Sequence, residues 1–127
     1  MNINDVSADI IDSALKVHTD LGPGCLESTY EACLAFELRR RGLSVETQVC
    51  LPLCYHAVQL DVGYRIDMLV ENIVIVENKT VTNVLPIHEA QLLSYLKLSG
   101  HKVGLLINFH VVHLRDGIKR MVNGLEE

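Results

Sequence analysis

The sequence predicts an α/β domain in which helices flank both faces of one mixed β-sheet. One observation is the order of its periodic segments, which runs ααβββαβ along the 127 residues. Another is the unbroken apolar run at residues 73–76, which is typical of a central strand buried on both faces. A chain of this length with 49% hydrophobic residues fits a single compact domain over residues 1–127.

Two helices are expected before the sheet. Residues 4–21 place apolar side chains at helical spacing, and the glycine- and proline-rich residues 22–24 end this helix. A second helix is expected over residues 26–41, with Gly42 as its stop. It ends in three arginines, at positions 39–41. Because the helix dipole favours positive charge there, this run is more typical of capping and solubility than of phosphate contact.

The remaining elements alternate between strand and helix. Residues 43–49 alternate as a strand that Pro52 ends or interrupts, and further strands are expected over 58–70 and 73–80. A helix over 88–99 and a strand over 103–109 follow, and a crossover of this length implies parallel pairing. The tail is ambiguous. We expect a short C-terminal hairpin there, with edge strands over residues 111–114 and 118–122 and residues 116–117 as its turn.

Composition limits the functional class. The formal net charge of −5 argues against a general nucleic-acid binder with a basic surface, although carboxylates gathered at a metal site would inflate the acidic count. No apolar run approaches a membrane span and the N-terminus lacks the features of a secretion signal, so we expect a cytoplasmic protein with no membrane partner.

The four cysteines are expected to be reduced thiols in this compartment. Cys50 and Cys54, followed by His56, provide too few ligands for a structural zinc site.

Three ionisable residues, Asp67, Glu77 and Lys79, lie within the most apolar part of the sequence. Buried carboxylates are costly unless they are paired or bound to a cation. Two interpretations remain open. The first is a structural ion pair, and the second is a divalent-metal site with a catalytic lysine beside it.

Strand register decides between these interpretations. Alternation places Glu77 and Lys79 on one face of their strand. If Asp67 shares that face, paired residue numbers across the hairpin must sum to an even value, which leaves an odd-numbered turn such as residues 71–73, or a bulge. A two-residue turn at Glu71 and Asn72 would instead send Asp67 and Glu77 to opposite faces and exclude the site.

Polar residues on two helices are further candidates. His88, Gln91 and Tyr95 form one stripe of the third predicted helix. This stripe could face a metal site, or its side chains could satisfy buried backbone groups. Glu27 lies in a first helical turn, where the dipole favours an acid, so capping is the stronger interpretation from the residues alone.

A resemblance adds to these observations. Asp67 followed by Glu77, Asn78 and Lys79 across a hairpin is similar to the core motif of the PD-(D/E)xK nuclease superfamily. Residues 24–30, GCLESTY, resemble the name-giving motif of the GxxExxY protein family, which is placed in that superfamily. The similarity covers nearly the whole chain and includes residues 21–24, 64–67, 88–92 and 104–109.

The resemblance implies a restriction-endonuclease-like core and a nuclease that depends on Mg²⁺ or Mn²⁺. It implies that Asp67, Glu77 and Glu27 hold the metal and that Lys79 is the catalytic lysine. Gln91 and Tyr95 match a Gln-x-x-x-Tyr element of related exonucleases. Asn78 departs from the family pattern, in which an apolar or small residue is expected, but it lies on the opposite face of the strand.

The leading hypothesis is therefore a metal-dependent phosphodiesterase acting on nucleic acid, with DNA favoured over RNA. Because the domain is small, we expect it to work as a homodimer. An alternative hypothesis is a binding or regulatory module that keeps the fold and the acidic pocket without turnover. A purely structural alternative has Lys79 neutralising the two carboxylates in a closed core.

Overall fold

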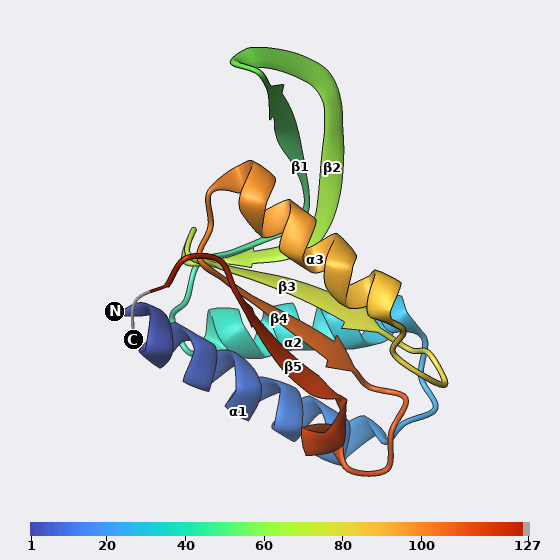
Figure 1. Ribbon diagram of the computed structural model, residues 1–127. Helices are drawn as coiled ribbons and strands as arrows, with labels where there is room; N and C mark the ends of the chain where they lie inside the picture. The colour runs from blue at the N-terminus through green and yellow to red at the C-terminus, as the bar shows by residue number, and fades with distance from the viewer. Residues whose placement is uncertain (126–127) are drawn as a thin grey trace.

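The computed structural model describes residues 1–125, apart from the side chains of residues 53 and 61–63. Within these residues, three α-helices surround one five-stranded sheet (Figure 1). The elements are α1 (Ile3–Leu21), α2 (Glu27–Arg40), β1 (Val45–Tyr55), β2 (Val58–Val70), β3 (Val74–Lys79), α3 (Pro86–Ser99), β4 (Val103–Asn108), the 3₁₀ helix η1 (Leu114–Gly117) and β5 (Ile118–Val122).

The sheet is mixed, with strand order β1-β2-β3-β4-β5. β1, β2 and β3 are antiparallel neighbours, β3 and β4 are parallel, and β5 returns antiparallel to β4. Helix α3 supplies the crossover that parallel strands need. The predicted element order and the central position of β3 are both confirmed.

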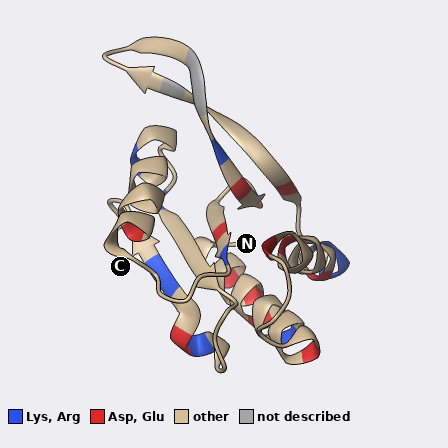
Figure 2. Ribbon diagram, turned by 90° about the vertical axis from the view of Figure 1, so that its right-hand side faces the viewer, with Lys and Arg blue, Asp and Glu red and all other residues tan. Residues whose placement is uncertain are grey.

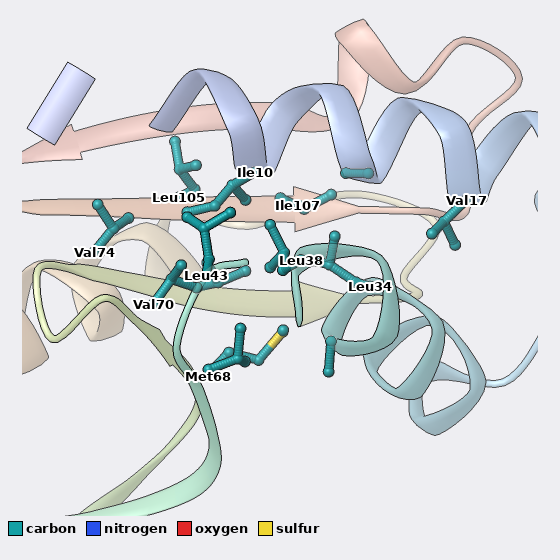
Figure 3. Close-up of a cluster of buried hydrophobic side chains, with 14 of the residues drawn as sticks. Ile10, Val17, Leu34, Leu38, Leu43, Met68, Val70, Val74, Leu105 and Ile107 are labelled. Atoms are coloured by element: carbon teal, nitrogen blue, oxygen red, sulfur yellow. The ribbon is translucent and has the colours of Figure 1, made fainter. Parts of the chain in front are cut away.

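Helices cover both faces of this sheet, as Figure 2 shows from the side. On one face, α1 and α2 bury a large apolar cluster against the strands, and part of this cluster is drawn in Figure 3. On the other face, α3 buries a smaller cluster around Leu92 and Leu96. Gly104 on β4 allows this close approach, since a Cβ at its position would lie 2.9 Å from Leu92 Cδ1.

The β1–β2 hairpin extends far beyond the body of the domain as an arm, which we define as residues 49–64 (Figure 1). The sequence left open whether Pro52 ends or interrupts this strand. The strand continues to Tyr55 with a register shift between Leu51 and Leu53, so Pro52 interrupts it without ending it. β1 is an edge strand, where a proline can be accommodated at a bulge or with its missing N–H on the open side.

Of the predicted C-terminal hairpin, the second strand forms with its predicted bounds, as β5, but the hairpin pairing was wrong. Residues 111–113 form no strand, and β5 pairs with β4 instead, beginning at Ile107 opposite Ile118. This pairing gives hydrogen-bond partners to the outer edge of a strand that is buried along its whole length. The connection packs tightly against β4, because a Cβ on Gly117 would lie 2.2 Å from the carbonyl oxygen of Asn108.

The β2–β3 register agrees with the even-sum prediction. Met68 pairs with Val76 and Val70 with Val74, which leaves the three-residue turn 71–73. Glu71 and Asn72 adopt left-handed φ values of 53° and 54° in this turn, and the Glu71 carboxylate accepts a hydrogen bond from the N–H of Ser44. Asp67 and Glu77 are therefore brought to the same place.

None of the helices within residues 1–125 is long and apolar enough to cross a membrane.

Candidate active site

The site forms where β2 and β3 part. Their ladder of paired residues ends at Met68 and Val76. Beyond this pair, the carboxylates of Asp67 and Glu77 accept the hydrogen bonds that backbone carbonyls would accept in a continued ladder. The N–H of Asp67 donates to Glu77 Oε1 at 3.1 Å, and the N–H of Asn78 donates to Asp67 Oδ2 at 2.8 Å. Each carboxylate is thus held by the backbone of the opposite strand, so the separation of the strands itself positions the two acids.

Burial makes this pair electrostatically unusual. Glu77 is only 6% exposed, and burial, reinforced by the charge of Asp67, raises its pKa to about 8. Burial also raises the pKa of Asp67, while the N–H of Asn78 and the charge of Lys79 act in the opposite direction. A site with this surplus of negative charge favours either a proton or a cation.

Lys79 lies at the end of β3, on the same face as Glu77. Its charge lowers the pKa values of Glu77, Asp67 and Glu27, so Lys79 lies within electrostatic reach of all three acids. The backbone around it is fixed by β4, since the Lys79 carbonyl accepts from the N–H of Phe109 at 2.9 Å.

The segment after Lys79 is held by Asn108. Its side-chain amide donates to the Val81 carbonyl at 2.8 Å and accepts from the Val81 N–H at 3.1 Å. This two-point contact fixes the chain where it leaves the sheet toward α3.

Glu27 reaches the site from the first turn of α2. Partial burial raises its pKa, and the charges of Asp67 and Lys79 shift it further in opposite directions. The structure therefore places Glu27 within electrostatic reach of both residues. A role in capping α2 does not exclude this placement, because the same first turn serves both.

The placement of Glu27 depends on Tyr30, which is fully buried. The Tyr30 hydroxyl donates to the carbonyl of Gly22 and accepts from the N–H of Cys25, and its ring stacks on Phe109 with centroids 4.3 Å apart. These contacts fix the loop that leads into α2. In residues 24–30, therefore, the tyrosine is a structural anchor and the glutamate is the residue within electrostatic reach of Asp67 and Lys79.

Two residues of the site were missed by the sequence analysis. Glu31 lies one turn after Glu27 on α2, and burial, followed by the charge of Asp67, raises its pKa. The amide of Gln48, on β1, donates to Glu31 Oε1 at 2.9 Å and also lowers the pKa of Asp67. The spacing of Glu27 and Glu31 could have indicated the first residue. Gln48 gave no such signal, because its side chain is re-aimed by a left-handed backbone with φ 53°.

The polar stripe of α3 lies at the border of the site. Tyr95 is buried, and its pKa is raised first by burial and then by the charges of Glu77 and Asp67, so it lies near the acidic pair. Gln91 is exposed and shares a surface hollow with Tyr95. His88 is used differently, since its Nδ1 accepts a hydrogen bond from the N–H of Leu85 at the start of the helix.

The arginine run does not border the site. Arg39 donates to the carbonyl of Val45, Arg40 pairs with Glu37, and Arg41 pairs with Asp9. These residues lie at the opposite end of α2 from Glu27, about 18 Å away at 1.5 Å per helical residue. Their contacts agree with the capping and solubility interpretation.

The donor set fits Mg²⁺ or Mn²⁺ in chemistry. Within the described residues, no three His, Cys, Asp or Glu side chains are gathered closely enough to hold a metal ion by themselves. Mg²⁺, however, is usually bound through one or two carboxylates, with waters and substrate phosphate oxygens completing its shell. Asp67 and Glu77 provide two adjacent carboxylates of this kind, with Glu27 and Glu31 nearby.

Comparison with known proteins gives one family. A family model described as the PD-(D/E)XK nuclease superfamily matches residues 4–121, which is nearly the whole chain. No curated protein and no solved structure matched the chain.

Proposed function

Because the chain belongs to the PD-(D/E)XK nuclease superfamily, we propose that it is a metal-dependent nuclease that hydrolyses phosphodiester bonds. The observation that carries this proposal is the reciprocal holding of Asp67 and Glu77 by each other's strands, beside Lys79. A purely structural ion pair would not require two carboxylates to be forced together at a raised pKa. We propose Mg²⁺ or Mn²⁺ as the metal.

Each residue has a role that follows from its position. Asp67 and Glu77 hold the cation, with Glu27 as a further acidic ligand or a group that orients its waters. The bound cation would polarise a phosphate oxygen and lower the pKa of a water. Lys79 orients the attacking water and stabilises the negative charge that develops on the phosphate. Gln48 holds Asp67 and Glu31 in place, since its amide donates to Glu31 and its hydrogen bond lowers the pKa of Asp67.

Gln91 and Tyr95 complete the proposed site on the α3 side. Both line the same surface hollow, and neither adds charge there. Water adds across one P–O bond of the backbone, and the departing oxygen takes a proton. The proposed substrate is DNA in preference to RNA, and the proposed working form is a homodimer.

A binding or regulatory module is the second candidate function. It is favoured by the net charge of −5 and by the engagement of all three arginines of α2 within the chain, far from the site. A nuclease site needs positive charge to attract phosphates, and here the bound metal would have to supply most of that charge.

A cleavage assay separates the two functions. The protein is incubated with single-stranded, duplex and branched DNA and with RNA, in Mg²⁺ or Mn²⁺, beside its Lys79→Ala variant. Lys102→Ala is the matched control, because Lys102 precedes β4 at the opposite end of the sheet from Lys79. We expect cleavage by the wild type and by Lys102→Ala but not by Lys79→Ala. No cleavage by any of them, with metal binding intact, supports the binding module instead.

A further inference from the structure

A hollow of about 400 Å³ lies between the base of the arm and the outer side of α3. Tyr64 on β2 forms its wall on the arm side, and Gln91, Ser94 and Tyr95 line it from α3. The proposed nuclease site uses only Gln91 and Tyr95 of the residues that line this hollow, so the hollow itself has no role yet.

The lining has the chemistry of a nucleobase site. Tyr64 and Tyr95 contact each other with ring centroids 5.0 Å apart and planes inclined by 54°. Tyr64 is 37% exposed, so part of its ring is open to a ligand. Among the residues whose side chains the structure describes, none that lines the hollow is a lysine, arginine, aspartate or glutamate. Exposed aromatic rings bind bases by stacking, whereas phosphates require cations.

The polar groups of the hollow suit a base edge. Gln91 offers both a donor and an acceptor, and Ser94 offers a hydroxyl. His88 also lines the hollow, and because its Nδ1 accepts from the N–H of Leu85, its Nε2 remains as the second ring nitrogen. These uncharged groups can hydrogen-bond the edge of a base without selecting a single one.

The hollow adjoins the acidic pair. Tyr64 precedes Asp67 by three residues of β2, which is about 10 Å at 3.3 Å per residue. Tyr95 lies between the two places, since it contacts Tyr64 and its phenol is influenced by the charges of Glu77 and Asp67. A strand with its phosphate at the carboxylates can therefore place a neighbouring base in the hollow.

We infer that this hollow receives an unpaired nucleobase of the strand whose phosphate lies at Asp67 and Glu77, stacked on Tyr64. This inference rests on the proposed nuclease function and names its substrate class: nucleic acid with an unpaired base beside the cleaved phosphate, as in single strands and frayed ends. A base within a duplex is excluded unless it first leaves its stack, which costs free energy.

Base stacking is tested by fluorescence, independently of cleavage. Single-stranded DNA carrying 2-aminopurine at successive positions is titrated with the protein in Ca²⁺ in place of Mg²⁺. We expect quenching of the 2-aminopurine at one position, lost in Tyr64→Ala and retained in Tyr64→Phe. Tyr55→Ala is the matched control, because Tyr55 is 61% exposed at the end of the same arm and outside the hollow. Absence of position-specific quenching overturns the inference.

Cleavage provides the second readout. Removal of the base from that position, by an abasic nucleotide, should slow cleavage by about 5- to 150-fold, the effect of losing one base–aromatic stack. Tyr64→Ala should show no such difference between the two substrates. Equal cleavage of both substrates by the wild type overturns this inference but leaves the nuclease intact. Quenching without any cleavage supports the base site and overturns the proposed hydrolysis.

Discussion

Replacing Glu77 by glutamine should change how the stability of the protein depends on pH. The glutamine side chain has nearly the same shape, keeps the oxygen that accepts from the N–H of Asp67, and is uncharged at every pH. In the wild type, burial raises the pKa of Glu77 from 4.5 to about 8 in the folded state. The unfolded chain has no such environment, so its Glu77 titrates near the ordinary value.

The sign of the effect follows from proton linkage. Below the pKa that Glu77 has in the unfolded chain, Glu77 is protonated in both states and does not change the free energy of unfolding. As the pH rises from 4.5 to about 8, the unfolded state loses the proton while the folded state keeps it, so the free energy of unfolding falls. Each pKa unit corresponds to about 1.4 kcal/mol, so the loss is on the order of 3 to 5 kcal/mol. Glu77→Gln removes this loss.

The assay is urea denaturation of the wild type and Glu77→Gln at pH 5 and pH 8, in EDTA. The variant should gain several kcal/mol over the wild type at pH 8 but little at pH 5. Glu46→Gln is the matched control, since Glu46 is an exposed residue of β1. A difference between wild type and Glu77→Gln that is the same at both pH values would refute the account of Glu77.

Three further predictions concern the anchor, the core and the cation. Tyr30→Phe should lower the free energy of unfolding by about 1 to 3 kcal/mol, because the Gly22 carbonyl and the Cys25 N–H lose their partner; an unchanged urea midpoint would contradict the anchoring role. Asn78→Leu should raise stability by about 1 kcal/mol, because Asn78 is fully buried and its Oδ1 has no hydrogen-bond partner among the described residues. A loss of stability by thermal or urea unfolding would show that this oxygen is satisfied. Mn²⁺ should bind more tightly at pH 8 than at pH 6, by up to about tenfold per pH unit, because it competes with the proton on Glu77; calorimetric affinities that are equal at the two pH values would exclude that competition.

Hydrophobic periodicity was sufficient to predict much of this fold from the sequence. The alternation along β3 and the long apolar run within it predicted a central strand, and the parity argument predicted the three-residue turn that brings Asp67 and Glu77 together. These features depend on the side-chain period of a strand, which the sequence displays directly.

Other features depended on tertiary context. Pro52 was expected to end or interrupt its strand, and which of these occurs depends on its place on an edge strand, where the arm continues past it. The turn signal at residues 116–117 was genuine, yet the following strand paired with β4 because that buried strand still had an open edge. Gln48 joined the site through a left-handed backbone conformation, which no pattern in the sequence indicates.

The most direct test of the central claim is calorimetric titration of Mn²⁺ into the wild type and the Asp67→Ala/Glu77→Ala double variant at pH 8, with Glu46→Gln as control. If the acidic pair holds the metal, the wild type and the control bind Mn²⁺ and the folded double variant does not. Equal binding by all three proteins would contradict the assignment of Asp67 and Glu77 as the metal site.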